Sequence, residues 1–277
     1  MTPTPDRRLT PATDRTVLEG WQDRAPRRPS ITAGRPARLA VPLADLCRAP
    51  AGARDRQVNF GADLTVIEDR DGWCFVRTAL DGYCGWLRSG GLGDPAAPIT
   101  HRVRAPATHV YPEPDMKTHQ LHALSIGARL SVTETQGQFA RLATGGWVPV
   151  QHIADHPAAD PVAIAERMIG TPYLWGGNSD WGIDCSGLVQ AALTAADIPC
   201  PGDSDLQRAA FAPTDTIRRG DLLFWPGHVA IAESDTSMIH ATAWQMSVIR
   251  EDIAHAKARI EAAGDGPFLG AHRPVPA

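Results

Sequence analysis

The sequence has no long hydrophobic run and no closely spaced cysteine pair, and both absences exclude classes of protein. No apolar stretch approaches the roughly 20 residues that a membrane-spanning helix needs, and the first 30 residues contain no apolar core that could serve as a signal peptide. The cysteines are odd in number and widely spaced, which fits neither a disulfide framework nor C-x-x-C metal sites. We therefore expect a cytoplasmic protein with no membrane partner and at least one free thiol. The five cysteines are Cys47, Cys74, Cys84, Cys185 and Cys200.

Positive charge and phosphate-binding motifs are also scarce. The net charge is −4, and Lys and Arg are spread out apart from the Arg-rich start, so nucleic acid is not an expected partner. No glycine-rich phosphate motif follows a predicted strand. The pairs His119/His122 and His152/His156 have a spacing that invites zinc, but no cysteine or acidic third ligand stands nearby, which favours solvated loop histidines. We expect no metal and no organic cofactor.

Residues 1–95 contain two stretches that differ in composition and in hydrophobic pattern. Residues 1–38 are rich in Pro, Arg and Thr and poor in apolar residues, which predicts an extended N-terminal arm. Residues 39–95 carry short alternating runs divided by the turn pairs Asp71-Gly72 and Asp81-Gly82. Alternation with period two between Asp-Gly turns is typical of antiparallel hairpins, and we expect a first small β-barrel here.

Residues 96–156 repeat this pattern in a weaker form. "GARLSVTETQGQFARLATGGWVPVQHI" lines up with "GADLTVIEDRDGWCFVRTALDGYCGWL", so that Gly127 matches Gly61 and Trp147 matches Trp86. Such self-similarity indicates a repeated supersecondary unit. Both units resemble bacterial SH3-like domains in their "G-W…D-G-Y-x-G-W" arrangement, although the second copy lacks the counterpart of Tyr83. We expect a second SH3-like barrel over this range.

The hydrophobic pattern of residues 157–277 differs again and predicts helices first and strands after them. "DPVAIAERMIG" predicts a helix capped by Asp160 with Pro161 at its first position, and a second helix is predicted over about 186–196. The segments "GDLLFW", "HVAIAE", "MIHATA" and "SVIRE" read as consecutive strands, and "FLGAHRP" could add another. Helices followed by an antiparallel sheet indicate an α+β domain.

Cys185 stands where a glycine-rich and aromatic stretch meets the second predicted helix. The thiolate is the nucleophilic form of cysteine, and a helix N-terminus favours it through unpaired N–H groups and a partial positive charge. Asp184 directly before it is a plausible helix cap. The sequence therefore predicts a reactive thiol on the first turn of a buried helix.

A cysteine nucleophile needs a base, and histidine has the unperturbed pKa that suits this task. Only His228 and His240, of ten histidines, lie in stretches that read as buried strands. His228 could accept the proton, and His240 on the next strand could orient its ring. Taken alone, a histidine near a strand start is more often a structural hydrogen-bonding residue.

The combination "Y-L-W-G-G…D-C-S-G-L-V", "G-D-L-L-F-W…H-V-A-I" and "I-H-A" over residues 162–273 resembles the NlpC/p60 family of papain-like bacterial cell-wall cysteine peptidases. The resemblance implies a papain-like peptidase domain after the two SH3-like barrels. It also implies Cys185 as nucleophile, His228 as base and His240 as the third polar residue. Tyr173 matches the tyrosine that stabilises the oxyanion together with the backbone N–H of Cys185. Only Pro226-Gly227 separates "LLFW" from His228, a tighter turn than the family often has.

Members with two SH3-like domains ahead of the peptidase resemble γ-D-glutamyl-L-diamino acid endopeptidases, which act on small murein-derived peptides with a free N-terminal L-Ala. In "GDSDLQ", Asp203 and Ser204 match the pair whose carboxylate binds the free amine, and Ser186 matches a substrate-contacting serine. Tyr83 matches a tyrosine that the first barrel contributes to the cleft, and Asp55 is the candidate for an expected acidic partner. The resemblance implies a role in murein peptide turnover or recycling.

Two alternatives stay open. An amidase or acyl transferase could use the same scaffold, and it would differ in its products. In the other alternative the protein is not a catalyst, and the barrels hold wall peptides beside an inert third domain.

Overall fold

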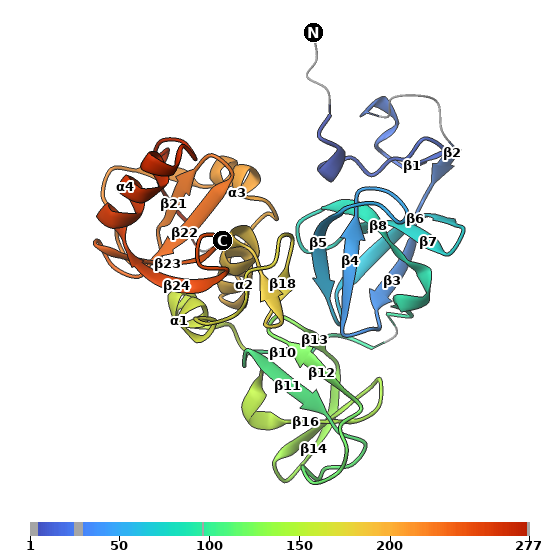
Figure 1. Ribbon diagram of the computed structural model, residues 1–277. Coiled ribbons are helices and arrows are strands. Elements are labelled where there is room, and N and C mark those ends of the chain that lie inside the picture. Colours follow the sequence, from blue (N-terminus) through green and yellow to red (C-terminus); the bar gives the residue numbers. More distant parts are fainter. Residues whose placement is uncertain (1–4, 25–29, 96, 276–277) are drawn as a thin grey trace. The chain divides into compact units, whose positions relative to one another are not determined.

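The computed structural model describes residues 5–24, 30–95 and 97–275, and their contacts group into two compact units (Figure 1). The first unit takes in residues 1–101, 109–124 and 128–148, and the second takes in residues 102–108, 125–127 and 149–277. No helix in the described part of the chain combines the length and the apolar content of a membrane span.

The first unit is built around a seven-stranded sheet with the order β5-β4-β8-β7-β6-β3-β9. The predicted hairpins are confirmed: β6 pairs with β7, and β7 pairs with β8, both antiparallel. Asp71 and Gly72 both have positive φ, as a two-residue turn of type I′ requires. The bounds are Arg35–Leu39 (β3), Leu43–Cys47 (β4), Arg54–Asn59 (β5), Asp63–Arg70 (β6), Trp73–Thr78 (β7), Cys84–Arg88 (β8) and Leu92–Gly93 (β9).

The prediction of an extended arm over residues 1–38 is wrong for the described part of that range. Thr16–Leu18 (β1) and Ser30–Thr32 (β2) form a parallel two-stranded sheet, and β3 already belongs to the barrel. Val17 is buried, and the hydroxyl of Thr13 donates a hydrogen bond to the Glu68 carboxylate of β6. These long-range contacts order the segment in spite of its low apolar content. Residues 1–4 and 25–29 of the predicted arm lie outside the described residues.

Residues 101–154 contain short strands that are divided between the two units. Arg102 and Val103 of β10 pair with β17, β11 pairs with β12, and β14, β15 and β16 form a three-stranded sheet. The expected second barrel over 96–156 is therefore not a compact unit by itself. The bounds are His101–Val103 (β10), Ala107–Val110 (β11), His122–Ser125 (β12), Arg129–Leu130 (β13), Val132–Gln136 (β14), Phe139–Leu142 (β15), Trp147–Pro149 (β16) and Ile153–Ala154 (β17).

The two glycines aligned by the repeat have the same local structure. Gly61 and Gly127 both have positive φ, of 75° and 81°. Gly61 N donates to the carbonyl of Leu39 at 2.9 Å, and Gly127 N donates to the carbonyl of Val103 at 3.0 Å. Each glycine thus closes a turn against the end of a strand, in a backbone conformation that residues with a Cβ rarely adopt.

The second unit has an antiparallel sheet with helices on both faces (Figure 1). The six strands run in the order β20-β25-β21-β22-β23-β24, and the five predicted strands are confirmed. The described part of the unit also contains β20 and a helix after β24, which the sequence analysis did not predict. The bounds are Pro161–Arg167 (α1), Asn178–Ser179 (β18), Gly182–Ile183 (β19), Cys185–Ala195 (α2), Ser204–Ala210 (α3), Ala212–Thr214 (β20), Leu222–Trp225 (β21), His228–Ala232 (β22), Ser237–Thr242 (β23), Ser247–Asp252 (β24), Ile253–Ala263 (α4) and Gly270–Arg273 (β25).

Alternating side chains of β22 and β23 pack into two different cores. Val229 and Ile231 belong to the core cluster that contains Leu188 and Val189 of α2. The intervening small residues of β22 belong to the cluster that contains Ile253, Ala256 and Ile260 of α4. Because successive side chains of a strand point to opposite faces, α2 covers one face of the sheet and α4 covers the other.

Candidate active site

Cys185 is the first residue of α2, and Asp184 before it caps the helix as predicted. The Asp184 carboxylate accepts hydrogen bonds from the N–H of Gly187 at 2.7 Å, the hydroxyl of Ser186 at 3.0 Å and the N–H of Gly176 at 2.9 Å. A Cβ at Gly187 would lie 2.4 Å from the carbonyl oxygen of Gly177, so this close approach requires glycine. The Asp184 carboxylate therefore fixes the loop that precedes Cys185 and α2.

The sulfur of Cys185 lies beside the start of β22. Sγ is 4.0 Å from the carbonyl oxygen of Gly227, and the backbone N–H of Val229 also acts on the sulfur. Since these two residues flank His228, the strand end that carries the predicted base passes directly by the predicted nucleophile. Cys185 is 8% exposed.

The pKa of Cys185 moves in the direction opposite to the prediction. Burial, followed by the charge of Asp184, raises it to about 12. The backbone N–H groups of Val229, Ser186 and Cys185 act to lower it, as expected at a helix N-terminus, but they do not offset the burial. At neutral pH the sulfur is therefore a thiol.

His228 and His240 are brought together as predicted. Nε2 of His228 lies 2.9 Å from Nδ1 of His240, and the side chain of His240 is fully buried. Burial, followed by the charges of His240 and Arg259, lowers the pKa of His228 to about 3. The site at neutral pH thus holds a neutral thiol and a neutral imidazole, with Nδ1 of His228 as the ring nitrogen that does not face His240.

Glu251 extends this line and was missed by the sequence analysis. Its Oε2 lies 3.0 Å from Nε2 of His240, and Arg259 of α4 donates to both of its oxygens at 2.9 Å. His255 Nδ1 lies 2.9 Å from Oε1. A signal was present: Ile253, Ala256 and Ile260 have the spacing of an amphipathic helix, which would cover the face of β24 that carries Glu251.

Tyr173 is placed near the predicted nucleophile. It forms an isolated β-bridge with Ile183, two residues before Cys185, and its N–H donates to the carbonyl of Met246 at 2.9 Å. Burial raises the pKa of Tyr173, and the charges of Cys185 and Asp184 raise it further. The phenol therefore lies within electrostatic range of the sulfur and keeps its proton, so it can donate a hydrogen bond.

The segment that carries Asp203 and Ser204 is tied to the nucleophile helix by Gln207, which the sequence analysis did not single out. Asp203 occupies the N-cap position of α3, and Ser204 is its first residue. The fully buried Gln207 Nε2 lies 2.9 Å from the carbonyl oxygen of Ser186, and the carbonyl oxygens of Pro201 and Gly202 lie 3.0 and 3.1 Å from it.

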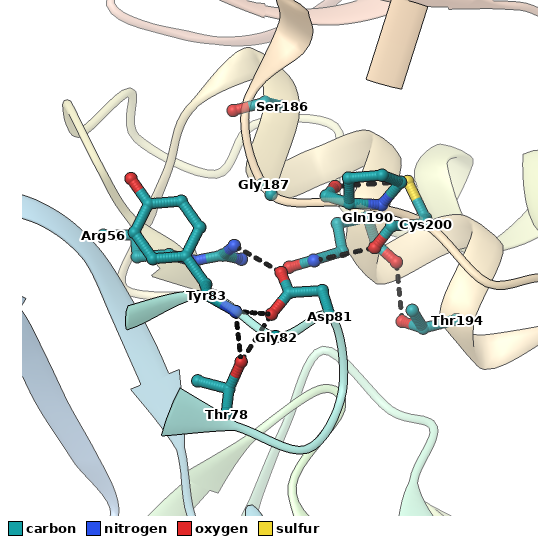
Figure 2. Close-up of polar contacts among 12 residues, drawn as sticks. Arg56, Thr78, Asp81, Gly82, Tyr83, Ser186, Gly187, Gln190, Thr194 and Cys200 are labelled. Atoms are coloured by element: carbon teal, nitrogen blue, oxygen red, sulfur yellow. Dashed lines mark hydrogen bonds and ion pairs between the residues drawn. The ribbon is translucent and has the colours of Figure 1, made fainter. Parts of the chain in front are cut away.

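A second amide reinforces this link. Gln190 of α2 donates to the carbonyl oxygen of Cys200 at 2.9 Å, as Figure 2 shows. The loop between α2 and α3 is thus held to α2 at two points.

The two candidate residues from the first barrel have partners within their own unit. Tyr83 belongs to the barrel core, and its N–H donates to Thr78 Oγ1 and Asp81 Oδ1 at 3.1 and 3.2 Å (Figure 2). Asp55 of β5 is 4% exposed, and its carboxylate pairs with Arg7 at 2.7 Å and with Arg48 at 3.2 Å. The role of Tyr83 and Asp55 in peptide binding stays a prediction.

No group of three or more His, Cys, Asp or Glu side chains suited to a metal ion occurs among the described residues. His152 Nδ1 lies 2.8 Å from Thr108 Oγ1, and His156 Nδ1 lies 2.8 Å from the carboxylate of Asp155. All five cysteines are free thiols, and all are buried.

Comparison with known proteins finds a family match within each unit. Residues 170–260 match the model of the NlpC/P60 family, and residues 46–92 match that of the bacterial dipeptidyl-peptidase SH3 domain. The chain is 31% identical to dipeptidyl-peptidase 6 of Lysinibacillus sphaericus over 67% of this chain and 79% of that protein. It is 28% identical to a γ-D-glutamyl-L-lysine dipeptidyl-peptidase of Bacillus subtilis, over 67% of this chain and 71% of that protein.

A solved structure has a similar fold over most of the chain. An NlpC/P60 family protein from Bacillus cereus aligns with a TM-score of 0.74 at 22% identity, and the alignment covers 87% of this chain and 100% of that one. This likeness shows the fold, and the identity to dipeptidyl-peptidase 6 shows the family. The chain belongs to the NlpC/P60 family of cysteine peptidases and carries a bacterial SH3 domain ahead of its peptidase domain.

Proposed function

We propose that the protein hydrolyses the bond between γ-D-glutamate and a diamino acid in murein-derived peptides that begin with a free L-Ala. The observation that carries the proposal is the position of the Cys185 sulfur at the start of β22, the strand that begins with His228, whose ring is paired with that of His240. The substrate class is supported by two relatives named γ-D-glutamyl-L-lysine dipeptidyl-peptidases.

In the first half of the reaction, Cys185 Sγ attacks the carbonyl carbon of the γ-glutamyl bond. The thiol proton passes to Nδ1 of His228 as the C–S bond forms, since burial disfavours a free thiolate before attack. The Tyr173 hydroxyl and the backbone N–H of Cys185 donate hydrogen bonds to the developing oxyanion. His228 then protonates the amine of the diamino acid, the C–N bond breaks and a thioester remains.

In the second half, water attacks the thioester and His228 takes its proton. The C–S bond breaks, the sulfur recovers the proton, and L-Ala-D-Glu leaves with the new carboxylate. Every proton is exchanged between Cys185, His228, water and the substrate, so the cycle needs no cofactor.

The free N-terminus of the substrate is proposed to bind the carboxylate of Asp203, beside Ser204 and Ser186. A carboxylate in a closed pocket rewards an ammonium group and disfavours an acylated nitrogen, because the charge would then be left without a counter-ion. The two glutamine contacts, Gln207 to Ser186 and Gln190 to Cys200, hold this loop against the nucleophile helix. Such support would fix the distance between the amine site and the Cys185 sulfur, and this fixed distance would select the release of a dipeptide.

The decisive experiment compares L-Ala-γ-D-Glu-meso-diaminopimelate with its N-acetylated form and with the L-lysine analogue. We expect hydrolysis of the free peptide and a loss of at least about 100-fold on acetylation, the cost of leaving a buried charge unpaired. Cys185→Ala should abolish turnover, whereas the matched variant Cys47→Ala in the first barrel should retain it. Turnover by Cys185→Ala, or no turnover of any of these peptides by the wild type, would overturn the proposal.

Product analysis separates the proposal from its enzymatic alternative. An amidase would release the whole stem peptide from a muramyl peptide, whereas the proposed enzyme leaves that substrate intact because its L-Ala is acylated. We further propose a papain-like peptidase domain, a second SH3-like domain over residues 96–156 and a cytoplasmic location, the last of which subcellular fractionation would test.

A further inference from the structure

Glu251 lies beside His240, at the ring nitrogen that does not face His228. Its Oε2 is 3.0 Å from Nε2 of His240, and the two side chains are 5% and 0% exposed. Within the described residues, Nε2 of His240 has no hydrogen-bond partner in good alignment, so this electrostatic contact is what acts on the nitrogen.

The carboxylate is kept ionised by its surroundings. Burial alone would raise the pKa of Glu251, but His240 and the two hydrogen bonds from Arg259 hold it well below its usual range. Arg259 is itself fixed, since its guanidinium carbon lies 4.2 Å from the ring centroid of Trp244. An anion is therefore present at this point throughout the neutral pH range.

We infer that Glu251 is a positioning residue that sets which nitrogen carries the proton on both histidines. An ionised carboxylate only accepts hydrogen bonds, and a bare nitrogen lone pair 3.0 Å away would be repelled, so Nε2 of His240 is protonated. When the His240 ring carries only this one proton, it presents a lone pair at Nδ1, and Nε2 of His228, 2.9 Å away, must donate to it. Nδ1 of His228 is left without a proton, which is the form that can accept one from Cys185.

The contacts from His228 through His240 to Glu251 run along the face of the sheet that α4 covers. His228 is on β22, His240 on β23 and Glu251 on β24, while Arg259 and His255 come from α4 and Cys185 comes from α2. Among the described residues, His240, Arg259 and Glu251 act on the His228 ring, and His255 faces the Glu251 carboxylate. The consequence for catalysis rests on the proposed function, but the proton positions can be measured without any substrate.

The first test is ¹⁵N NMR of histidine-labelled protein at pH 7.5, with His228 and His240 assigned by single substitution. We expect both rings to be neutral and protonated at Nε2. A wild-type His240 ring that carries its proton on Nδ1 would overturn the inference at once, whatever the enzyme hydrolyses.

The second test follows alkylation of Cys185 by iodoacetamide, quantified by mass spectrometry between pH 6 and 10. Glu251→Met removes the acceptor and should slow alkylation by about 10- to 100-fold, the size of the loss seen when the partner that orients a metal-bound histidine is removed. Glu251→Gln keeps a carbonyl oxygen and should lose less. The control Glu261→Met removes an exposed carboxylate of α4 and should leave the rate unchanged.

A double variant separates orientation from an unpaired charge. Glu251→Met with Arg259→Met removes the guanidinium that would otherwise lose its partner, and we expect alkylation to stay slow. Recovery of the wild-type rate in the double variant would contradict the inference, because the loss would then come from Arg259. Slow, Glu251-dependent alkylation without any peptide hydrolysis would refute the proposed function and leave this inference standing.

Discussion

Nε2 of His228 lies 2.9 Å from Nδ1 of His240, so two rings on neighbouring strands share one hydrogen bond. Only one of these nitrogens can hold the proton, and only one arrangement leaves a basic nitrogen for Cys185. His240→Leu removes the acceptor and should lower kcat by about 10²- to 10⁴-fold with a small change in KM, because a histidine in the wrong tautomer does not serve as a base. Peptide hydrolysis under saturating substrate measures this.

The comparison variant for His240 is His240→Asn, whose amide oxygen can still accept from His228 and should retain more activity than His240→Leu. His156→Asn changes an exposed histidine and serves as the control. Equal loss in the Leu and Asn variants would show that the ring acts by shape alone.

Asp184 is expected to stabilise the fold and to restrain the thiol at the same time. Asp184→Ala loses the cap of α2 and the bond to Gly176, which should lower the free energy of unfolding by about 2–4 kcal/mol. Asp184→Asn keeps one acceptor oxygen but removes the charge that helps to raise the pKa of Cys185, so iodoacetamide should alkylate the sulfur faster at pH 8. Urea unfolding and alkylation rates measure the two effects.

The matched control for Asp184 is Asp160, which caps α1 by a hydrogen bond of 2.9 Å from Val162 N. Asp160→Asn should alter stability without changing the reactivity of Cys185. Slower alkylation of the Asp184→Asn variant would mean that the cap aligns the sulfur more than its charge suppresses it.

The depressed pKa of His228 predicts a loss of stability in mild acid. The folded ring has a pKa of about 3 against 6.5 for an unperturbed histidine, so the unfolded chain binds a proton that the folded chain does not bind between these values. The contribution is complete above pH 6.5 and is lost as the pH falls towards 3. From pH 7 to pH 5 it should lower the free energy of unfolding by about 2 kcal/mol.

His228→Gln removes this proton and should make unfolding less dependent on pH by the same amount. Urea unfolding at pH 7, 6 and 5 on both proteins provides the measurement, since the histidines that do not contact His228 cancel in the difference. Parallel curves for the two proteins would show that the folded ring takes up its proton near the ordinary pKa.

The helices and strands that follow a clear period were predictable from the sequence. Asp160 and Asp184 cap α1 and α2 as expected, and the two histidines meet because their strands are neighbours. Glu251 was not predictable from its own strand, since a charged residue near the end of an edge strand normally faces solvent. It is buried only because α4 folds over that face.

Long-range ion pairs and burial account for two errors of the sequence analysis, the extended N-terminal arm and the lowered pKa of Cys185. Arg7 pairs with Asp55, 48 residues later, and no local pattern indicates such a contact. The pKa of Cys185 was expected to fall because a helix end is visible in the sequence. The depth of burial that raises this pKa is a property of the packed domain and has no such signature.

Gly61 offers a test of how closely the first barrel is packed against the segment that follows it. Its φ is +75°, and a Cβ there would lie 1.9 Å from the carbonyl oxygen of Arg129, within the same unit. Gly72 has a similar φ of +78°, but nothing lies within 4 Å of its Cβ position. Alanine at either site pays the left-handed backbone cost of about 1–2 kcal/mol. Only Gly61→Ala must also displace backbone.

We therefore expect Gly61→Ala to lower the free energy of unfolding by about 1–3 kcal/mol more than Gly72→Ala does, the usual cost of overpacking. Arg129 N donates to the carbonyl of Phe60 at 2.9 Å, and the displacement should break this hydrogen bond first. Hydrogen exchange at the Arg129 amide, followed beside urea unfolding, measures both effects. Equal losses in the two variants, with the Arg129 amide still protected, would show that the backbone yields at this point without cost.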